Sequence, residues 1–272
     1  MTTFLFWNLN GKPLEAIVAN LASRHDVDVL MFVECAIEVS AMLSALNPKG
    51  SSRYYFAPDG DCEKVVIYSS FPPQFIESVH RTNRLTIRKL KLPGLTEILL
   101  AVTHFPSKLH WSDPSQFAEC TELSREIRKV EDEARHLRTV LVGDLNMNPY
   151  ENGMLAANGL NAAMTQKVAS RGKRTVAGKE YPFFYNPMWG HFGDRTEGPP
   201  GTFYHQDSGH VTPFWHILDQ VLIRSDLLSC FQNGSLEILS TDGAQSFLSA
   251  SSGRPDRRVA SDHLPILFEL NL

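Results

Sequence analysis

Nine polar side chains stand at the ends of predicted strands or in the turns beside them. Asp144 and Asn146 follow the apolar run 140–142, and their spacing of two residues places both side chains on one face of an extended chain. Such a pair is costly to desolvate without partners, and hard oxygen ligands such as the Glu34 carboxylate suit Mg²⁺. The full set is Asn8, Asn10, Glu34, His104, Asp144, Asn146, Asp219, Asp262 and His263.

Each of these residues has an ordinary alternative explanation. Asp144 could cap a following helix, and Glu34 could lie beside a helix dipole. Asp219 could lie on a solvated strand face, Asp262 could form a turn, and His104 could be a hydrogen-bonded structural histidine. Their shared position at strand ends favours a ligand site, because such sites in sheet proteins gather there.

The surrounding pattern predicts an α/β (α+β) fold in which strands and helices alternate. Strands are predicted at 4–9, 27–33, 64–70, 84–90, 97–105, 140–142, 216–224 and 235–241, and at the C-terminal end. Helices are predicted at 13–24, 37–46, 115–137 and 150–157. We expect a four-layer sandwich of two mostly antiparallel sheets flanked by helices. No low-complexity linker divides the chain, so we expect a single domain over residues 1–272.

The composition is that of an ordinary globular protein: 272 residues, 43% hydrophobic and 21% charged. The net charge of −4 argues against binding of nucleic acid by bulk charge, so a local basic patch or a metal ion must meet any phosphate-bearing ligand. No apolar run approaches the roughly 20 residues that span a bilayer. The start of the chain lacks the features of a secretory signal, and four scattered cysteines favour free thiols in the cytoplasm.

Seven short stretches, taken in order, resemble the endonuclease/exonuclease/phosphatase superfamily, which includes DNase I, exonuclease III, the sphingomyelinases and the inositol polyphosphate 5-phosphatases. The resemblance extends from Asn8 to His263. The stretches are FWNLNG (6–11), FVE (32–34), THFPS (103–107), GDLNMNP (143–149), GTFYH (201–205), LDQVL (218–222) and SDH (261–263). The resemblance implies a metal-dependent phosphoesterase.

The resemblance also implies which residues hold the metal. Glu34 would be the main ligand of Mg²⁺, for which Mn²⁺ could substitute, with Asn8 and Asp262 close by as direct or indirect ligands. His263 would pair with Asp219, whose carboxylate fixes the imidazole tautomer and raises its basicity, as in a catalytic triad.

The remaining roles concern the water and the phosphate. Asp144 would orient or deprotonate the attacking water, or protonate the leaving group. Asn146 and Asn10 would hold phosphate oxygens, and His104 would donate to the phosphate from the other side. Histidine at position 104 is typical of DNase I-like and phosphatase-like members, whereas the apurinic-site repair branch typically carries tyrosine, so repair at abasic sites becomes a weaker expectation.

Cationic and aromatic residues indicate the substrate only weakly. Arg254, Arg257 and Arg258 precede Asp262 and are well placed to bind a phosphate. A basic loop at 167–179, with Arg81, Arg84 and Arg88, could contact a polyanion, and aromatics at 181–192 could stack on bases or form a small core. We therefore expect a nuclease acting on DNA or RNA; the alternatives are a phosphatase or phosphodiesterase acting on inositol phosphates or nucleotides, and, less favoured, a non-catalytic binding module.

Overall fold

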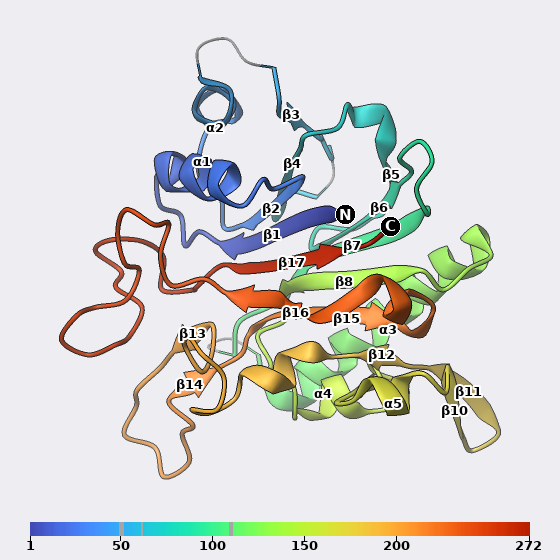
Figure 1. Cartoon of the computed structure of the whole chain (residues 1–272). Coiled ribbons are helices and arrows are strands. Elements are labelled where there is room, and N and C mark those ends of the chain that lie inside the picture. The colour runs from blue at the N-terminus through green and yellow to red at the C-terminus, as the bar shows by residue number, and fades with distance from the viewer. Residues whose placement is uncertain (49–51, 61, 109–110) are drawn as a thin grey trace.

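Two β-sheets lie face to face in the computed structural model, which describes residues 1–48, 52–60, 62–108 and 111–272 (Figure 1). The first sheet has six strands in the order β16 (Phe231–Ile238), β17 (Ile266–Leu270), β1 (Thr2–Asn8), β2 (Val29–Val33), β4 (Val65–Ser69) and β3 (Tyr55–Phe56). Only β1 and β2 pair in parallel in this sheet, and the other neighbours are antiparallel.

The second sheet has seven strands, among them those that carry His104, Asp144 and Asp219. Its order is β5 (Ile76–Arg81), β6 (Leu85–Leu90), β7 (Ile98–His104), β8 (Thr139–Asp144), β15 (Asp219–Arg224), β12 (Phe184–Tyr185) and β9 (Ala162–Ala163). The pairs β7–β8 and β9–β12 are parallel and the rest antiparallel. The prediction of two mostly antiparallel sheets is confirmed.

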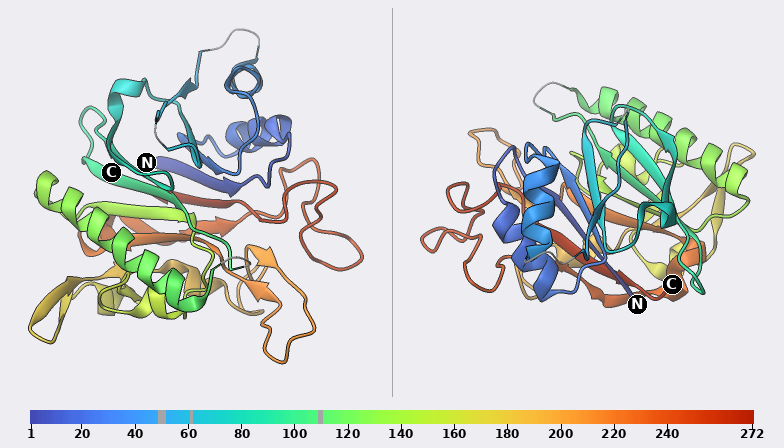
Figure 2. Two further views of the ribbon diagram at one scale, coloured as in Figure 1. Left: turned by 180° about the vertical axis from the view of Figure 1, so that it is seen from behind. Right: turned by 90° about the horizontal axis from the view of Figure 1, so that it is seen from above.

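Helices cover the outer faces of both sheets (Figure 2). The helices α1 (Glu15–Arg24) and α2 (Val39–Leu46) lie outside the first sheet, and α3 (Asp113–Ala134) lies outside the second. The remaining elements are α4 (Asn152–Leu155), α5 (Gln166–Ala169), the short 3-10 helices η2 (Pro73–Phe75), η3 (Pro187–His191) and η4 (Ser225–Cys230), and the hairpins β10 (Lys173–Val176)–β11 (Lys179–Pro182) and β13 (Phe203–Tyr204)–β14 (Trp215–His216). Within the described ranges, none of the helices is both long and apolar enough to cross a membrane.

Strand β8 shows how side-chain alternation builds the layers. Val140 and Val142 belong to the large apolar cluster to which both sheets contribute. Leu141, between them, belongs to a second cluster with Leu123 and Ile127 of α3. Because successive side chains of a strand point to opposite faces, β8 packs against the other sheet on one side and against α3 on the other. This double burial fixes where the strand, and therefore Asp144, lies.

The predicted helix at 150–157 is wrong in length. Only Asn152–Leu155 is helical, and Ala156 already has an extended backbone. The chain then turns back, so that the Leu160 amide donates to the Gly153 carbonyl at 3.0 Å. Gly153 also packs closely on α3, where an added Cβ would lie 3.0 Å from the Cys120 sulfur. Tertiary contact therefore ends this helix earlier than its composition suggests.

Candidate active site

Adjacent strands of the second sheet place three predicted residues in a row. The register pairs His104 of β7 with Asp144 of β8, and Asp144 with Asp219 of β15. Gly143 permits this approach, because a Cβ there would lie 2.1 Å from the Thr103 carbonyl oxygen. Strands β7 and β8 thus end, and β15 begins, at the same edge of the sheet.

The first sheet brings Asn8 and Glu34 to the same place. The parallel strands β1 and β2 pair Asn8 with Val33, and Glu34 comes next with a left-handed φ of 47°. The Asn8 Nδ2 donates to Glu34 Oε1 at 3.2 Å and to Asp144 Oδ2 at 3.0 Å. One buried amide therefore joins the two sheets at their strand ends.

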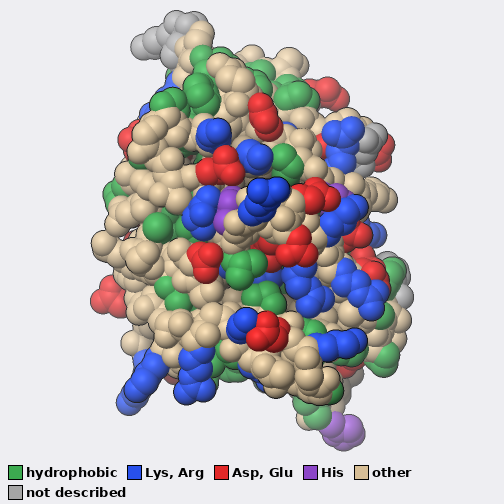
Figure 3. Space-filling model, turned by 90° about the vertical axis from the view of Figure 1, so that its right-hand side faces the viewer, with side chains coloured by type: hydrophobic (Ala, Val, Ile, Leu, Met, Phe, Trp, Pro, Cys, Tyr) green, Lys and Arg blue, Asp and Glu red, His purple; other side chains and the backbone are tan. Residues whose placement is uncertain are grey.

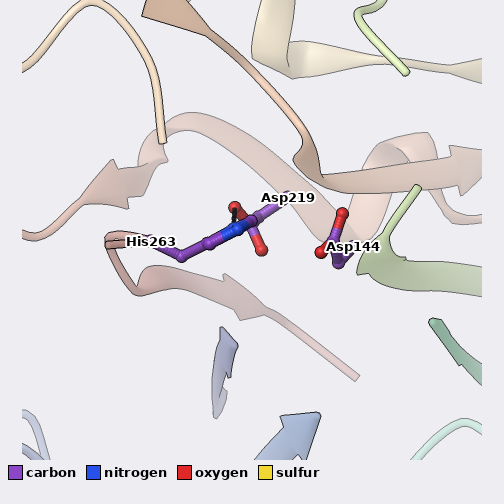
Figure 4. A group of neighbouring side chains, drawn as sticks. All are labelled: Asp144, Asp219 and His263. Atoms are coloured by element: carbon purple, nitrogen blue, oxygen red, sulfur yellow. Dashed lines mark hydrogen bonds and ion pairs between the residues drawn. The ribbon is translucent and has the colours of Figure 1, made fainter. Parts of the chain in front are cut away.

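His263 and Asp219 form the predicted pair. The His263 Nδ1 lies 2.8 Å from Asp219 Oδ2, with both residues buried, and the side chains point toward each other (Figure 4). Burial alone would lower the pKa of His263, but the carboxylates of Asp219, Asp144 and Asp262 raise it to about 10. The imidazole is therefore a cation at neutral pH, and no hydrogen bond from its Nε2 to a described residue competes with a ligand.

Asp144 is a fully buried carboxylate beside this pair. Burial, with the neighbouring Asp219 charge, raises the pKa of Asp144, while His263 opposes the rise. The ligand atoms of Asp144, Asp219 and His263 lie within 4.8 Å of one another (Figure 4). Asp219 Oδ1 is also buried and accepts no hydrogen bond from any described residue. Two buried carboxylates thus face one imidazole in this cluster.

His104 faces the same carboxylates from the opposite side. Its Nε2 lies 3.4 Å from Glu34 Oε1 and 3.8 Å from Asp144 Oδ2. Burial lowers the pKa of His104, although both carboxylates oppose this shift. A neutral imidazole with Nε2 at the centre could donate to a ligand placed between Glu34 and Asp144.

Asn10 and Asn146 lie in two turns with the same local geometry. Each has a left-handed φ of 49°, and each backbone amide donates at 2.9 Å to the side chain two residues earlier, Asn8 Oδ1 and Asp144 Oδ1 respectively. Asn10 lines the cleft described below, whereas the Asn146 side chain donates to the Phe105 carbonyl at 3.0 Å. These turns hold Asn8 and Asp144 by their oxygen atoms.

In the 254–262 segment, each of the three predicted arginines contacts another side chain of the protein. Arg257 bonds to Asp262, so this carboxylate is turned toward Arg257. Arg258 pairs with Asp256 at 2.8 Å, and the guanidinium of Arg254 lies 4.2 Å above the Tyr204 ring. Tyr204 follows Phe203, whose ring lies 4.8 Å from the His263 ring.

An open cleft of about 610 Å³ lies beside Glu34 and His104. Arg84, Lys64 and Trp111 line it, with Asn10 at its edge. Arg84 was predicted only as a member of a general basic set, and Lys64 and Trp111 were missed because no motif marks them. Thr202 was also missed as a separate residue; its hydroxyl accepts the Asp219 amide at 3.2 Å, and its place in the stretch GTFYH was the available signal.

The structure corrects the basic set predicted for the substrate surface and chooses between the two alternatives for the aromatic stretch. Arg88 is buried and pairs with Asp59 at 3.1 Å, so it does not meet a polyanion. The 167–179 segment forms α5 and the β10–β11 hairpin, which projects from the end of the molecule opposite the 241–260 loop (Figure 1). On that side, cationic and anionic side chains are mixed (Figure 3). Phe183, Phe184 and Tyr185 are buried, so they belong to the core.

The donor set fits a hard divalent cation. The carboxylates of Glu34 and Asp144 both approach the Asn8 amide, and the nearby Asp219 Oδ1 has no partner in the described part of the chain. A divalent cation would balance this excess of oxygen donors and negative charge. The cluster Asp144–Asp219–His263 is a poorer position, because His263 Nδ1 and Asp219 Oδ2 already bond to each other.

Comparison with known proteins gives the same family over most of the chain. A family model for the endonuclease/exonuclease/phosphatase family matches residues 5–263, whereas no curated protein matches the sequence. Among solved structures, the endonuclease domain of TRAS1, a telomere-specific non-LTR retrotransposon, is similar with 16% identity, coverage of 100% of this chain and 99% of its own, and a TM-score of 0.53.

Two further structures show the same fold. A mannosyl-6-phosphatase from Bacteroides thetaiotaomicron has 14% identity, full coverage of both chains (100% each) and a TM-score of 0.59. D. rerio TDP2 complexed with single strand DNA product has 15% identity, coverage of 100% and 99%, and a TM-score of 0.54. With the family match over residues 5–263, the chain belongs to the endonuclease/exonuclease/phosphatase family.

Proposed function

We propose that this protein is a metal-dependent nuclease that hydrolyses phosphodiester bonds of DNA or RNA by in-line attack of water. One observation carries the proposal: Glu34, Asp144 and the His263–Asp219 pair converge from both sheets, joined through Asn8 and the paired ends of β8 and β15. Phosphoryl transfer needs charge stabilisation, a positioned water and a stabilised leaving oxygen, and these residue types supply all three.

The protein side chains have distinct parts in this reaction. The His263 cation, held by Asp219, donates from Nε2 to a phosphoryl oxygen. Asp144 orients the water and accepts its proton, and its raised pKa suits a general base. The phosphate oxygens are held by His104, Asn10 and Asn146. For this role the Asn146 amide must first give up its hydrogen bond to the Phe105 carbonyl.

Glu34 would hold the metal, with Asn8 beside it. Asp262 could join as a ligand only if its carboxylate first left Arg257. Mg²⁺ is the expected ion, and Mn²⁺ a substitute, because both prefer oxygen ligands. When bound, the ion supplies charge neutralisation at the phosphate and leaving oxygens. The Glu34 side chain is 43% exposed and lines the open cleft, so an ion with bound waters can reach it.

Cations and aromatic rings on both sides of the centre support a polymeric substrate. On the Glu34 side, the cleft carries Arg84 and Trp111, and on the His263 side Arg254 stacks on Tyr204. Bases stack on aromatic faces and phosphates bind cations, so a strand could extend in both directions from the scissile bond. The solved D. rerio TDP2 complex, with its single strand DNA product, is consistent with such a substrate for this fold.

The test is a substrate panel with Mg²⁺: single-stranded and duplex DNA, RNA, inositol phosphates, nucleotides and sugar phosphates. We expect polymer cleavage that EDTA abolishes and Mg²⁺ restores. Phosphate release from small esters alone would overturn the nuclease proposal in favour of a phosphatase. Failure of well-folded protein to turn over any substrate with Mg²⁺ or Mn²⁺ would overturn the phosphoesterase proposal itself.

Arg254→Ala tests the polymer contact directly, with Arg171→Ala as the matched control. Arg171 is an exposed arginine near the β10–β11 hairpin, away from the centre. Loss of a phosphate or base contact by Arg254 should raise KM for the polymer by roughly 3- to 10-fold with little change in kcat. Equal KM values for both variants would remove Arg254 from the substrate-binding set.

A further inference from the structure

The loop that follows Asp144 is buried but lies outside the regular ladder of the sheet. Leu145, Met147 and Asn148 are each at most 3% exposed, and the chain turns through the left-handed Asn146 between them. Buried backbone carbonyls in such a turn must find hydrogen-bond donors elsewhere. Two of the donors come from glutamine side chains on other elements.

Gln116 of α3 meets this loop from outside the second sheet. Gln116 is 1% exposed, and its Nε2 donates to the Asn146 carbonyl and to the Pro106 carbonyl, both at 3.1 Å. Pro106 lies two residues after His104. A single amide therefore ties together the two segments that follow the strands carrying Asp144 and His104.

Gln220 meets the same loop from β15. It is fully buried, and its Nε2 donates to the carbonyls of Met147 and Ile217, the latter at 3.0 Å. Its Oε1 accepts from the buried Asn186 amide at 2.7 Å, which fixes which end of the Gln220 side chain faces the loop. Gln220 directly follows Asp219, so this contact ties the Asp144 loop to the strand of the His263 partner.

The choice of amides has an electrostatic reason. A lysine or arginine could also donate to these carbonyls, but its charge beside the buried Asp144 would lower the pKa that burial raises. A carboxamide donates without adding charge and does not titrate. Gln116 and Gln220 thus satisfy the loop and leave the charge of the centre unchanged.

We propose that Gln116 and Gln220 are positioning residues that clamp the 145–148 loop and thereby hold Asp144 and Asn146 in register with His104 and Asp219. The inference rests on the proposed function for its catalytic consequence, whereas the clamp itself concerns the fold. Neither glutamine contacts the reacting atoms. Both act through the backbone of the loop.

The test uses Gln116→Leu and Gln220→Leu, which keep roughly the size of the side chain and remove the donor. Glu131→Gln is the matched control, because Glu131 is a buried polar residue on the same helix that pairs with Arg224. This control loses stability without touching the loop. Each protein is assayed with bis(4-nitrophenyl) phosphate and Mn²⁺, and backbone hydrogen exchange is measured without metal.

The clamp predicts a separation of effects. In the glutamine variants kcat should fall by roughly 10- to 100-fold, KM should stay within about twofold, and the backbone amides of residues 144–148 should exchange faster. Glu131→Gln should lower Tm while leaving kcat and these amides unchanged. An equal loss of kcat in the glutamine variants and in Glu131→Gln, each assayed at the same interval below its own Tm, would overturn the clamp. Unchanged exchange of the amides of residues 144–148 would also overturn it. A parent that is inactive on this diester and on the whole substrate panel would overturn the proposed function alone, since hydrogen exchange still decides the clamp.

Discussion

Two groups of buried charges include residues of β15 in the second sheet, and they differ in how fully their polar atoms are paired. At one, Arg224 meets Glu131 through two bonds of 2.8 and 3.0 Å, donates to the Pro182 carbonyl at 2.9 Å and lies 3.7 Å from the Phe184 ring centre. At the other, Asp144 and Asp219 lie side by side, and Asp219 Oδ1 is without a partner throughout the described chain.

The difference in pairing distinguishes a group of charges that stabilises the fold from one that can bind a ligand. A buried ion pair with every polar group satisfied can hold elements together but leaves nothing for a ligand. A cluster with excess negative charge and an unpaired oxygen is costly to the fold, and such cost is found where a ligand or ion completes the site. The Glu131–Arg224 pair therefore joins α3 to β15, whereas the Asp144–Asp219–His263 cluster is where we propose that the reaction takes place.

The largest expected effect comes from the proposed catalytic cluster. His263→Ala and Asp144→Ala should each lower kcat by roughly 10²- to 10⁴-fold, because each removes a proton-transfer or charge-stabilising group. For Asp144→Ala, Tm should stay close to that of the parent, because burial of this carboxylate raises its pKa and is itself a cost to the fold. His263→Ala leaves the Asp219 carboxylate buried without its partner and should lower Tm, so kcat is measured well below the melting range of each variant. Near-normal rates in either variant, in the polymer assay with Mg²⁺, would contradict the role assigned to that residue.

The opposite pattern is expected at the structural pair. Glu131→Ala leaves Arg224 buried without its carboxylate, which should lower the free energy of unfolding by about 3–5 kcal/mol. Urea unfolding measures this loss, and kcat below the melting range should equal that of the parent. A large loss of kcat in the folded variant would show that the two clusters are coupled.

Glu34→Gln is expected to change the metal requirement first. The amide keeps the size of the side chain but weakens a hard oxygen ligand, so half-maximal activity should need roughly tenfold more Mg²⁺. Activity is titrated with Mg²⁺ in the parent, in Glu34→Gln and in the control Glu38→Gln, which lies at the N-terminal end of α2. Identical titrations for the parent and Glu34→Gln would exclude Glu34 as the ligand.

The smallest effect concerns stability against pH in the metal-free protein. The pKa of His263 is about 10 in the folded state and about 6.5 when unfolded, so its contribution is complete below pH 6.5 and is lost as the pH rises toward 10. Asp219→Asn removes the main carboxylate behind this shift. The urea midpoint should therefore fall less between pH 7 and about 9.5 in the variant than in the parent. Parallel curves would mean that His263 is not charged at neutral pH.

The sequence determined which residues could form the centre and where along the chain they would stand. Asp144 and Asn146 follow a run of apolar residues that must be buried, so a polar turn at the end of that strand was readable from the order of residues. The local geometry followed as well, because an Asp or Asn side chain readily accepts the amide two residues on, as Asn8 and Asp144 do.

Only the tertiary structure decided which of these groups meet. Strand register sets Asp144 opposite both His104 and Asp219, and a shift by one residue would turn each side chain to the other face. Long-range contacts also bury Arg88 against Asp59 and bring Gln116 under the Asn146 carbonyl. Local sequence does not encode such pairings, since they depend on which distant segments share a buried space.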